Sequence, residues 1–200
     1  MLPKSAKYWL TFLIAFAIVW LGAINVRFLI GNELLIFDEF NFRTAIPPDE
    51  EETIFRMVAN SSILIICSYI LTLIAAIGFV RTCKLNFKEN PWLLMNCILF
   101  FIFVPVELYT AYLDYRFITL FFSKPENHDQ LLKIFGERIG FLKGTPWVAM
   151  LSYYCIIIIS VFQPLKKSKA ELNILKKKFK EQYSYEYILH EEDDLAVKDN

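Results

Sequence analysis

Four long runs of apolar residues dominate this sequence of 200 residues. A bilayer core of about 30 Å needs about 20 residues of α-helix at 1.5 Å per residue. The runs that meet this length cover residues 8–30, 57–80, 92–113 and 145–165. Inside lipid, backbone N–H and C=O groups find no water, so a spanning segment must satisfy them within one helix. The sequence therefore predicts an all-α integral membrane protein whose four spanning helices form a bundle.

Composition also favours a membrane location. Apolar residues make up 56% of the chain, against about 45–50% in soluble domains even when Gly is counted. The first run follows Lys4 and Lys7, as in a signal peptide, but it exceeds the usual apolar region of about 7–15 residues. We therefore expect it to be a retained span. Residues 1–165 then form one transmembrane domain and residues 166–200 a tail.

The distribution of Lys and Arg predicts the topology, because cytoplasmic loops are enriched in these residues. The N-terminus, the segment 81–90 and the tail are rich in Lys and Arg, whereas the loop between the first two runs is mainly acidic. The loop between the third and fourth runs opposes this pattern with five basic residues. The dense lysines that follow the fourth run outweigh it. Both termini are thus predicted to be cytoplasmic, in a plasma or inner membrane.

The two loops predicted to lie outside have patterns of their own. In the second, apolar residues recur at helical spacing: Leu131, Leu132, Phe135, Ile139 and Leu142. This predicts a short amphipathic helix with Lys133, Glu137 and Arg138 on its other side. It could lie at the membrane interface, dock a partner or cover the protein's own bundle. Residues 33–42 mix apolar and acidic side chains and are expected at the membrane surface.

The tail is predicted to begin as a basic cytoplasmic helix and to end in an acidic segment. Pro164 is expected to kink or end the fourth span, because proline lacks a backbone N–H. Lys166, Lys167 and Lys169 are candidates for binding anionic lipid headgroups. The same lysines are explained equally well as a topology signal alone.

Polar residues in the third span are the best functional candidates, since ionisable groups at membrane depth are costly. At about 100° per residue, one stripe of that helix contains Asn96, Phe103, Glu107 and Asp114, and Pro105 is expected to kink the helix. Two interpretations of Glu107 are open. It pairs with Arg27 of the first span and sets the helix register, or it is the coupling group of an ion or proton path.

Catalytic motifs are sparse. Glu51, Glu52 and Arg56 fit the EExxxR pattern of intramembrane proteases, which also use downstream histidines. Only His128 and His190 exist, and neither is expected to lie on a span facing these carboxylates. The acidic start of a helix explains the match more simply. Histidines for haem, clustered metal ligands and a phosphate loop are also missing from the sequence. We expect no enzymatic activity, no cofactor, no metal and no nucleic-acid partner.

The four-span layout resembles the general topology of claudin-like and tetraspanin-like proteins. The likeness stops at topology, because those families carry cysteines in their outer loops. Here the cysteines are Cys67, Cys83, Cys97 and Cys155, and none of them lies in a predicted outer loop.

The sequence leads to two functional hypotheses. The first is a non-catalytic subunit, scaffold or assembly factor of a larger membrane protein complex, with the lipid bilayer and other membrane subunits as its partners. The second is a small ion- or proton-coupled transporter that uses the intramembrane carboxylate of Glu107.

Overall fold

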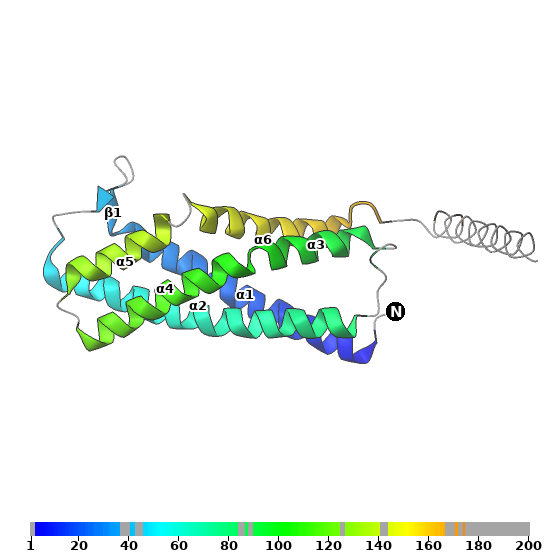
Figure 1. The fold of residues 1–200 in the computed structure, drawn as a ribbon, viewed down its shortest axis with the longest axis horizontal. Helices are drawn as coiled ribbons and strands as arrows, with labels where there is room; N and C mark the ends of the chain where they lie inside the picture. Colours follow the sequence, from blue (N-terminus) through cyan, green and yellow to red (C-terminus); the bar gives the residue numbers. More distant parts are fainter. Residues whose placement is uncertain are drawn as a thin grey trace, which may run out of the picture.

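The computed structural model describes residues 3–36, 41–42, 46–83, 87, 90–124, 127–140, 144–166, 171 and 174. In chain order the elements are α1 (Lys4–Asn32), β1 (Leu35–Ile36), β2 (Asn41–Phe42), α2 (Pro48–Thr82), α3 (Pro91–Ile102), α4 (Val104–Ser123), α5 (His128–Gly140) and α6 (Thr145–Phe162) (Figure 1). The two short strands pair antiparallel, with Leu35 opposite Phe42. They occupy part of the segment expected at the membrane surface. The remaining regular structure in the described ranges is helical.

Four helical segments are long and apolar enough to cross a membrane. They are Lys4–Asn32, Pro48–Thr82, Pro91–Ser123 and Thr145–Phe162. This confirms the predicted helical class and the number of candidate spans. The basic helix predicted after residue 165 falls almost entirely outside the described residues.

Two spans extend beyond their predicted bounds. α2 begins at Pro48, well before residue 57, with Asp49, Glu50 and Glu51 in its first turn. Proline is tolerated at a helix start, and acidic side chains there interact favourably with the helix dipole. α4 continues past residue 113 to Ser123, because its additional turns bury side chains against other helices, as shown below.

The third and fourth spans end or break at proline. The third span is interrupted at Phe103, where α3 ends and α4 begins, and Pro105 lies in the first turn of α4. Because Pro105 cannot donate a backbone hydrogen bond, the helix breaks where a kink was predicted. α6 ends at Phe162, and Gln163 adopts a left-handed conformation (φ 45°) directly before Pro164. This confirms that the proline ends the span.

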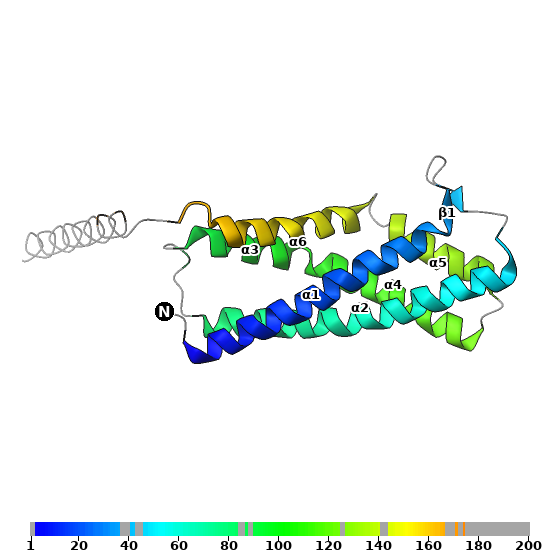
Figure 2. The same ribbon diagram turned by 180° about the vertical axis from the view of Figure 1, so that it is seen from behind.

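The helices pack lengthwise in an elongated arrangement. α1 runs antiparallel to α2 and crosses it at an angle, α3 lies beside α6, and α4 contacts α2, α5 and α6 (Figures 1 and 2). α5 folds back over the end of the molecule that is far from the N-terminus.

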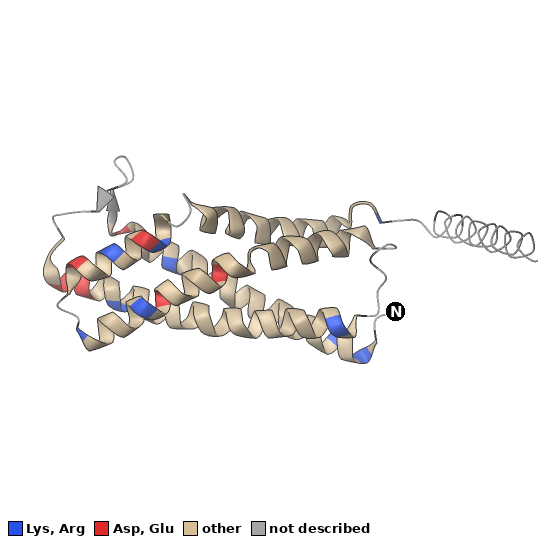
Figure 3. Cartoon of the chain, in the orientation of Figure 1, with Lys and Arg blue, Asp and Glu red and all other residues tan. Residues whose placement is uncertain are grey.

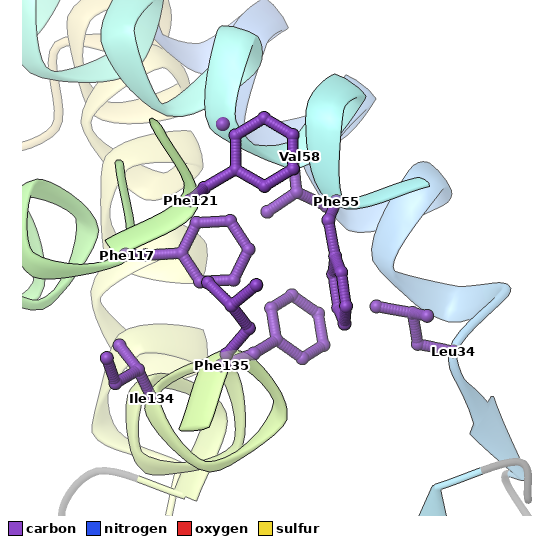
Figure 4. Close-up of a cluster of buried hydrophobic side chains, with 9 residues drawn as sticks. Leu34, Phe55, Val58, Phe117, Phe121, Ile134 and Phe135 are labelled. Carbon is purple, nitrogen blue, oxygen red and sulfur yellow. The ribbon is translucent and has the colours of Figure 1, made fainter. Parts of the chain in front are cut away.

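The largest apolar cluster lies beneath α5. Its buried members are Leu34, Phe55, Val58, Ala59, Phe117, Phe121, Leu131, Ile134 and Phe135. Figure 4 shows the phenylalanine rings of α2, α4 and α5 pointing toward one another. α5 therefore covers the protein's own helices, with Lys133 and Glu137 exposed as predicted. Leu142 lies outside the described residues.

Much of the remaining helix surface is apolar and exposed. α6 buries only Ala149 and Tyr153, whereas its Val161 and Phe162 are 71% and 78% exposed. Large contiguous apolar patches are unusual on soluble monomers, and they suit contact with lipid or with other membrane proteins.

Gly31 allows α1 and α5 to approach closely, which yields a stability prediction. A Cβ atom at Gly31 would lie 2.7 Å from the Phe135 ring, and Phe135 is buried in the α5 cluster. Gly31→Ala should therefore lower the free energy of unfolding by about 1–3 kcal/mol through overpacking. Unfolding in mixed detergent micelles, followed by circular dichroism, measures the change.

Gly22→Ala is the matched control. Gly22 lies in the same helix, and a Cβ there meets no atom within 4 Å. This substitution should be neutral or stabilising by up to about 1 kcal/mol, since alanine favours helix more than glycine does. Equal stability of the two variants would contradict the close contact between α1 and α5.

Candidate functional site

The four predicted intramembrane polar residues are all buried between helices. Arg27, Asn96, Glu107 and Asp114 are 3%, 8%, 9% and 1% exposed. Phe103, on the same stripe, is partly buried and packs against a cluster formed by Trp20, Tyr69 and Tyr153, among others. The polar stripe of the third span thus faces inward. Its residues divide into a charged centre and a hydrogen-bonded group around Glu107.

Asp114 on α4 is the charged centre. Its Oδ1 atom lies 2.5 Å from Nη1 of Arg27 on α1, which donates a hydrogen bond to it. The same oxygen lies 2.7 Å from Nε of Arg138 on α5. One carboxylate therefore joins three helices, and all three side chains are at least four-fifths buried.

Of the two interpretations of Glu107 left open by the sequence, its pairing with Arg27 is wrong, because Arg27 pairs with Asp114. The prediction compared depths along straight helices, but the third span is interrupted at Phe103 and α1 crosses its neighbour at an angle. Equal distances along the chain then do not correspond to equal depths. The guanidinium of Arg27 instead reaches Asp114, about two turns beyond Glu107 on α4.

The prediction for Arg138 is also wrong. The helical pattern predicted that it lies on the outer side of α5 with Lys133 and Glu137. It turns inward to Asp114. Arg138 follows the buried Ile134 by four residues and Leu131 by seven, so all three share one helix face. That spacing was the available signal.

The centre keeps unused hydrogen-bonding capacity. Nε and Nη2 of Arg27, Oδ2 of Asp114 and Nε of Arg138 are buried and have no hydrogen-bond partner in the part of the chain that the structure describes, so the contact of Arg138 with Asp114 is an ion pair without a hydrogen bond of good geometry. Leaving such an atom unpaired typically costs about 1–3 kcal/mol. The three side chains of the centre carry a net formal charge of +1, because two guanidinium groups share one carboxylate.

Glu107 is surrounded by aromatic side chains. The Tyr153 hydroxyl of α6 donates a hydrogen bond to Oε1 of Glu107 at 3.2 Å. The Tyr153 ring packs edge-on against Trp20, with centroids 4.7 Å apart, and Trp20 packs against Tyr69 at 5.0 Å. Among the described residues, no Lys or Arg forms an ion pair with Glu107.

Three side-chain hydrogen bonds attach α6 to different helices. Besides the bond from Tyr153, Asn25 Nδ2 donates to the Tyr154 hydroxyl at 2.6 Å, and Asn96 Nδ2 donates to Ser160 Oγ at 2.8 Å. In membrane proteins such bonds contribute about 0.6 kcal/mol each on average. Sequence reasoning found Asn96 but missed the hydroxyl partners, since hydroxyl residues are common in spanning helices.

A histidine lies beside the EExxxR segment of α2. Nδ1 of His128, at the start of α5, lies 3.0 Å from Oε2 of Glu51 on α2. His128 does not lie on a candidate span, as expected, but it still reaches Glu51 because α5 folds back onto α2. His190 lies outside the described residues.

The described residues around the EExxxR segment connect two helices and do not form a metal site. Glu52 pairs with Arg56 on the same helix at 2.8 Å, with both side chains well exposed. No group of three or more His, Cys, Asp or Glu residues suited to a metal ion occurs in the described ranges. The contact between Glu51 and His128 holds the start of α5 against α2.

Of the candidate headgroup ligands, only Lys166 is described. It is exposed, and its Nζ donates a hydrogen bond to Oε1 of Gln163 at 2.6 Å. Lys167 and Lys169 lie outside the described residues.

Comparison of the chain with protein-family models, with curated proteins and with solved structures finds no match in any of the three.

Asp114 provides the second stability prediction. Asp114→Leu removes the carboxylate that both arginines contact and leaves Arg27 and Arg138 buried without their partner. The free energy of unfolding should fall by about 3–5 kcal/mol, as is typical when one member of a buried ionic group is removed. Unfolding in mixed micelles measures it. Glu52→Gln, which removes an exposed pair, should change stability by less than about 1 kcal/mol.

A triple variant separates lost charge pairing from lost packing. Arg27→Met with Asp114→Leu and Arg138→Met replaces the whole centre by apolar side chains, which is often tolerated. This variant should be more stable than Asp114→Leu alone. If Asp114→Leu is no more harmful than Glu52→Gln, the centre does not hold the helices together.

Proposed function

We propose that this chain is a non-catalytic integral membrane subunit or assembly factor of a larger membrane protein complex. Its four apolar helices form the membrane bundle, both termini are cytoplasmic, and α5 covers the opposite end. The proposal rests on one observation, which is that charged side chains from different helices pair with one another within the chain. Arg27 and Arg138 meet on Asp114, and His128 meets Glu51. These contacts join α1, α2, α4 and α5, so they serve the fold.

The exposed surface supports a role in assembly. α6 is the least buried of the candidate spans. Of the residues in its most apolar stretch, 11% are buried, against 39% for α2. Its Leu151 and Ile158 are 60% and 55% exposed and lie seven residues apart, on one helix face. Within membranes, helix association depends on close packing between such faces. We therefore assign the exposed face of α6 to contact with a partner subunit.

Purification from the native membrane in mild detergent tests this proposal. The wild-type chain should elute with other membrane proteins in constant ratio. Leu151→Ala with Ile158→Ala reshapes the α6 face while keeping it apolar, and it should reduce recovery of the partner severalfold. The control is Ile14→Ala with Ile18→Ala, at exposed positions of α1. A stable monomer that elutes alone would count decisively against a role as a subunit.

One observation favours the second candidate, a small ion- or proton-coupled transporter. Glu107 is 9% exposed, and its carboxylate accepts a hydrogen bond from the Tyr153 hydroxyl. Nearby buried atoms of the charged centre have no hydrogen-bond partner among the described residues. A buried carboxylate with a hydroxyl partner suits a group that exchanges a proton.

Glu107→Gln distinguishes the two functions. Glutamine can still accept the hydrogen bond of Tyr153, so we expect unchanged folding and unchanged recovery of partner subunits. Vesicles that contain the wild-type chain should then show no more proton or cation flux than empty vesicles. Flux through wild type that disappears in Glu107→Gln but persists in Glu52→Gln would instead establish transport.

A further inference from the structure

A shallow groove lies at the end of the molecule where α1 begins and α2 ends. Its volume is about 350 Å³, close to the lower limit of small-molecule sites, and its lining residues are Trp9, Ile74, Ile77, Gly78, Arg81 and Thr82. It is distinct from the buried polar residues around Asp114 and Glu107 and from the lysines that follow α6.

The surface of the groove is almost entirely hydrocarbon. The Trp9 indole lies against Gly78 so closely that a Cβ there would be 2.6 Å from the ring. The Thr82 hydroxyl is occupied, because it donates a hydrogen bond to the Gly78 carbonyl at 2.8 Å. Ile74 and Ile77 are 52% and 37% exposed beside them. The groove thus presents apolar side chains and one guanidinium group, that of Arg81.

Positive charge surrounds this end of the helices. Arg81 is exposed in the last turn of α2, and Lys4 and Lys7 are exposed in the first turns of α1. Ala6 packs with Phe79 and Cys83, so the two helix ends lie together. Figure 3 shows Lys and Arg, and no Asp or Glu, on the described ribbon where α1 begins and α2 ends.

We propose that this groove binds one anionic glycerophospholipid, with an acyl chain along Trp9, Ile74 and Ile77 and the phosphate near Arg81, at the end of the molecule where Lys4 and Lys7 are also exposed. The mainly apolar lining suits hydrocarbon better than a sugar or a peptide backbone, which would need several polar partners. Arg81, together with the positive charge of the nearby Lys4 and Lys7, attracts an anionic headgroup, and an interfacial tryptophan is typical of headgroup depth. The site requires the fold of α1 and α2 alone, so it holds for either proposed function.

Lipid retention by the full-length protein tests the site. The protein is reconstituted in vesicles of equal parts phosphatidylserine and phosphatidylcholine, extracted in mild detergent and examined by native mass spectrometry. Wild type should retain one phosphatidylserine in preference to phosphatidylcholine. Arg81→Gln should weaken retention about fivefold, the effect of removing roughly one basic residue near an anionic headgroup. Arg116→Gln, which removes an exposed arginine of α4, should leave retention unchanged.

A second pair of variants tests the hydrocarbon part of the groove. Ile74→Trp fills it and should displace the lipid, whereas Leu64→Trp, at a similarly exposed position ten residues earlier in α2, should not. Circular dichroism and elution volume establish that all variants fold. Soluble glycerophosphoserine should fail to displace the bound lipid, because it has no acyl chain.

Three results would overturn the proposal. The first is that wild type retains the two lipids equally. The second is that neither Arg81→Gln nor Ile74→Trp changes lipid retention. The third is that glycerophosphoserine alone displaces the bound lipid. The proposal would also fail if the wild-type chain forms a dimer that Ile74→Trp abolishes. The groove would then bind a second copy of the chain and not a lipid.

Discussion

The carboxylate of Asp114 is the interaction on which the arrangement of α1, α4 and α5 depends. A charged side chain at membrane depth is costly unless another group neutralises it. Here one oxygen atom forms ion pairs with both Arg27 and Arg138, so any sliding of these helices past one another separates opposite charges in an apolar environment. Apolar packing in lipid is far less selective, since lipid tails are as apolar as the side chains that they contact. The charged centre therefore supplies the specificity that hydrophobicity does not.

The two ends of the molecule are held by different interactions. Beneath α5, phenylalanine packing, the close approach at Gly31 and the contact between Glu51 and His128 combine with the charged centre. At the other end a smaller cluster around Ala6, Phe79 and Leu93 joins the helices, and Arg81 lies at the edge of an apolar groove. One end is closed over a packed core, and the other offers a surface suited to lipid.

Between these ends, Tyr153, Tyr154 and Ser160 of α6 form hydrogen bonds with three other helices, and only Ala149 and Tyr153 of α6 are buried. Its outer face stays exposed and apolar. An element with few buried contacts within its own chain can contribute most of its surface to a neighbour. This is the physical basis for assigning α6 to a subunit contact.

Several features followed from the sequence alone. Uninterrupted apolar runs of about 20 residues force helices in lipid, because the backbone must satisfy its own hydrogen bonds. Pro105 and Pro164 marked the interruption and the end of two spans, since proline lacks the donor that a helix needs. The spacing of Asn96, Glu107 and Asp114 placed these residues on one inward face, because helical periodicity is a local property.

Only the tertiary structure decided which charges meet. The choice of Asp114 rather than Glu107 as the partner of Arg27 depends on the crossing of α1 and on the interruption at Phe103. The contacts of Arg138 and His128 depend on α5 folding back over α2 and α4. These are distances between segments far apart in the chain, and no pattern within one segment encodes them. The number and character of the helices are thus local properties of the sequence, whereas their pairing is a property of the packed molecule.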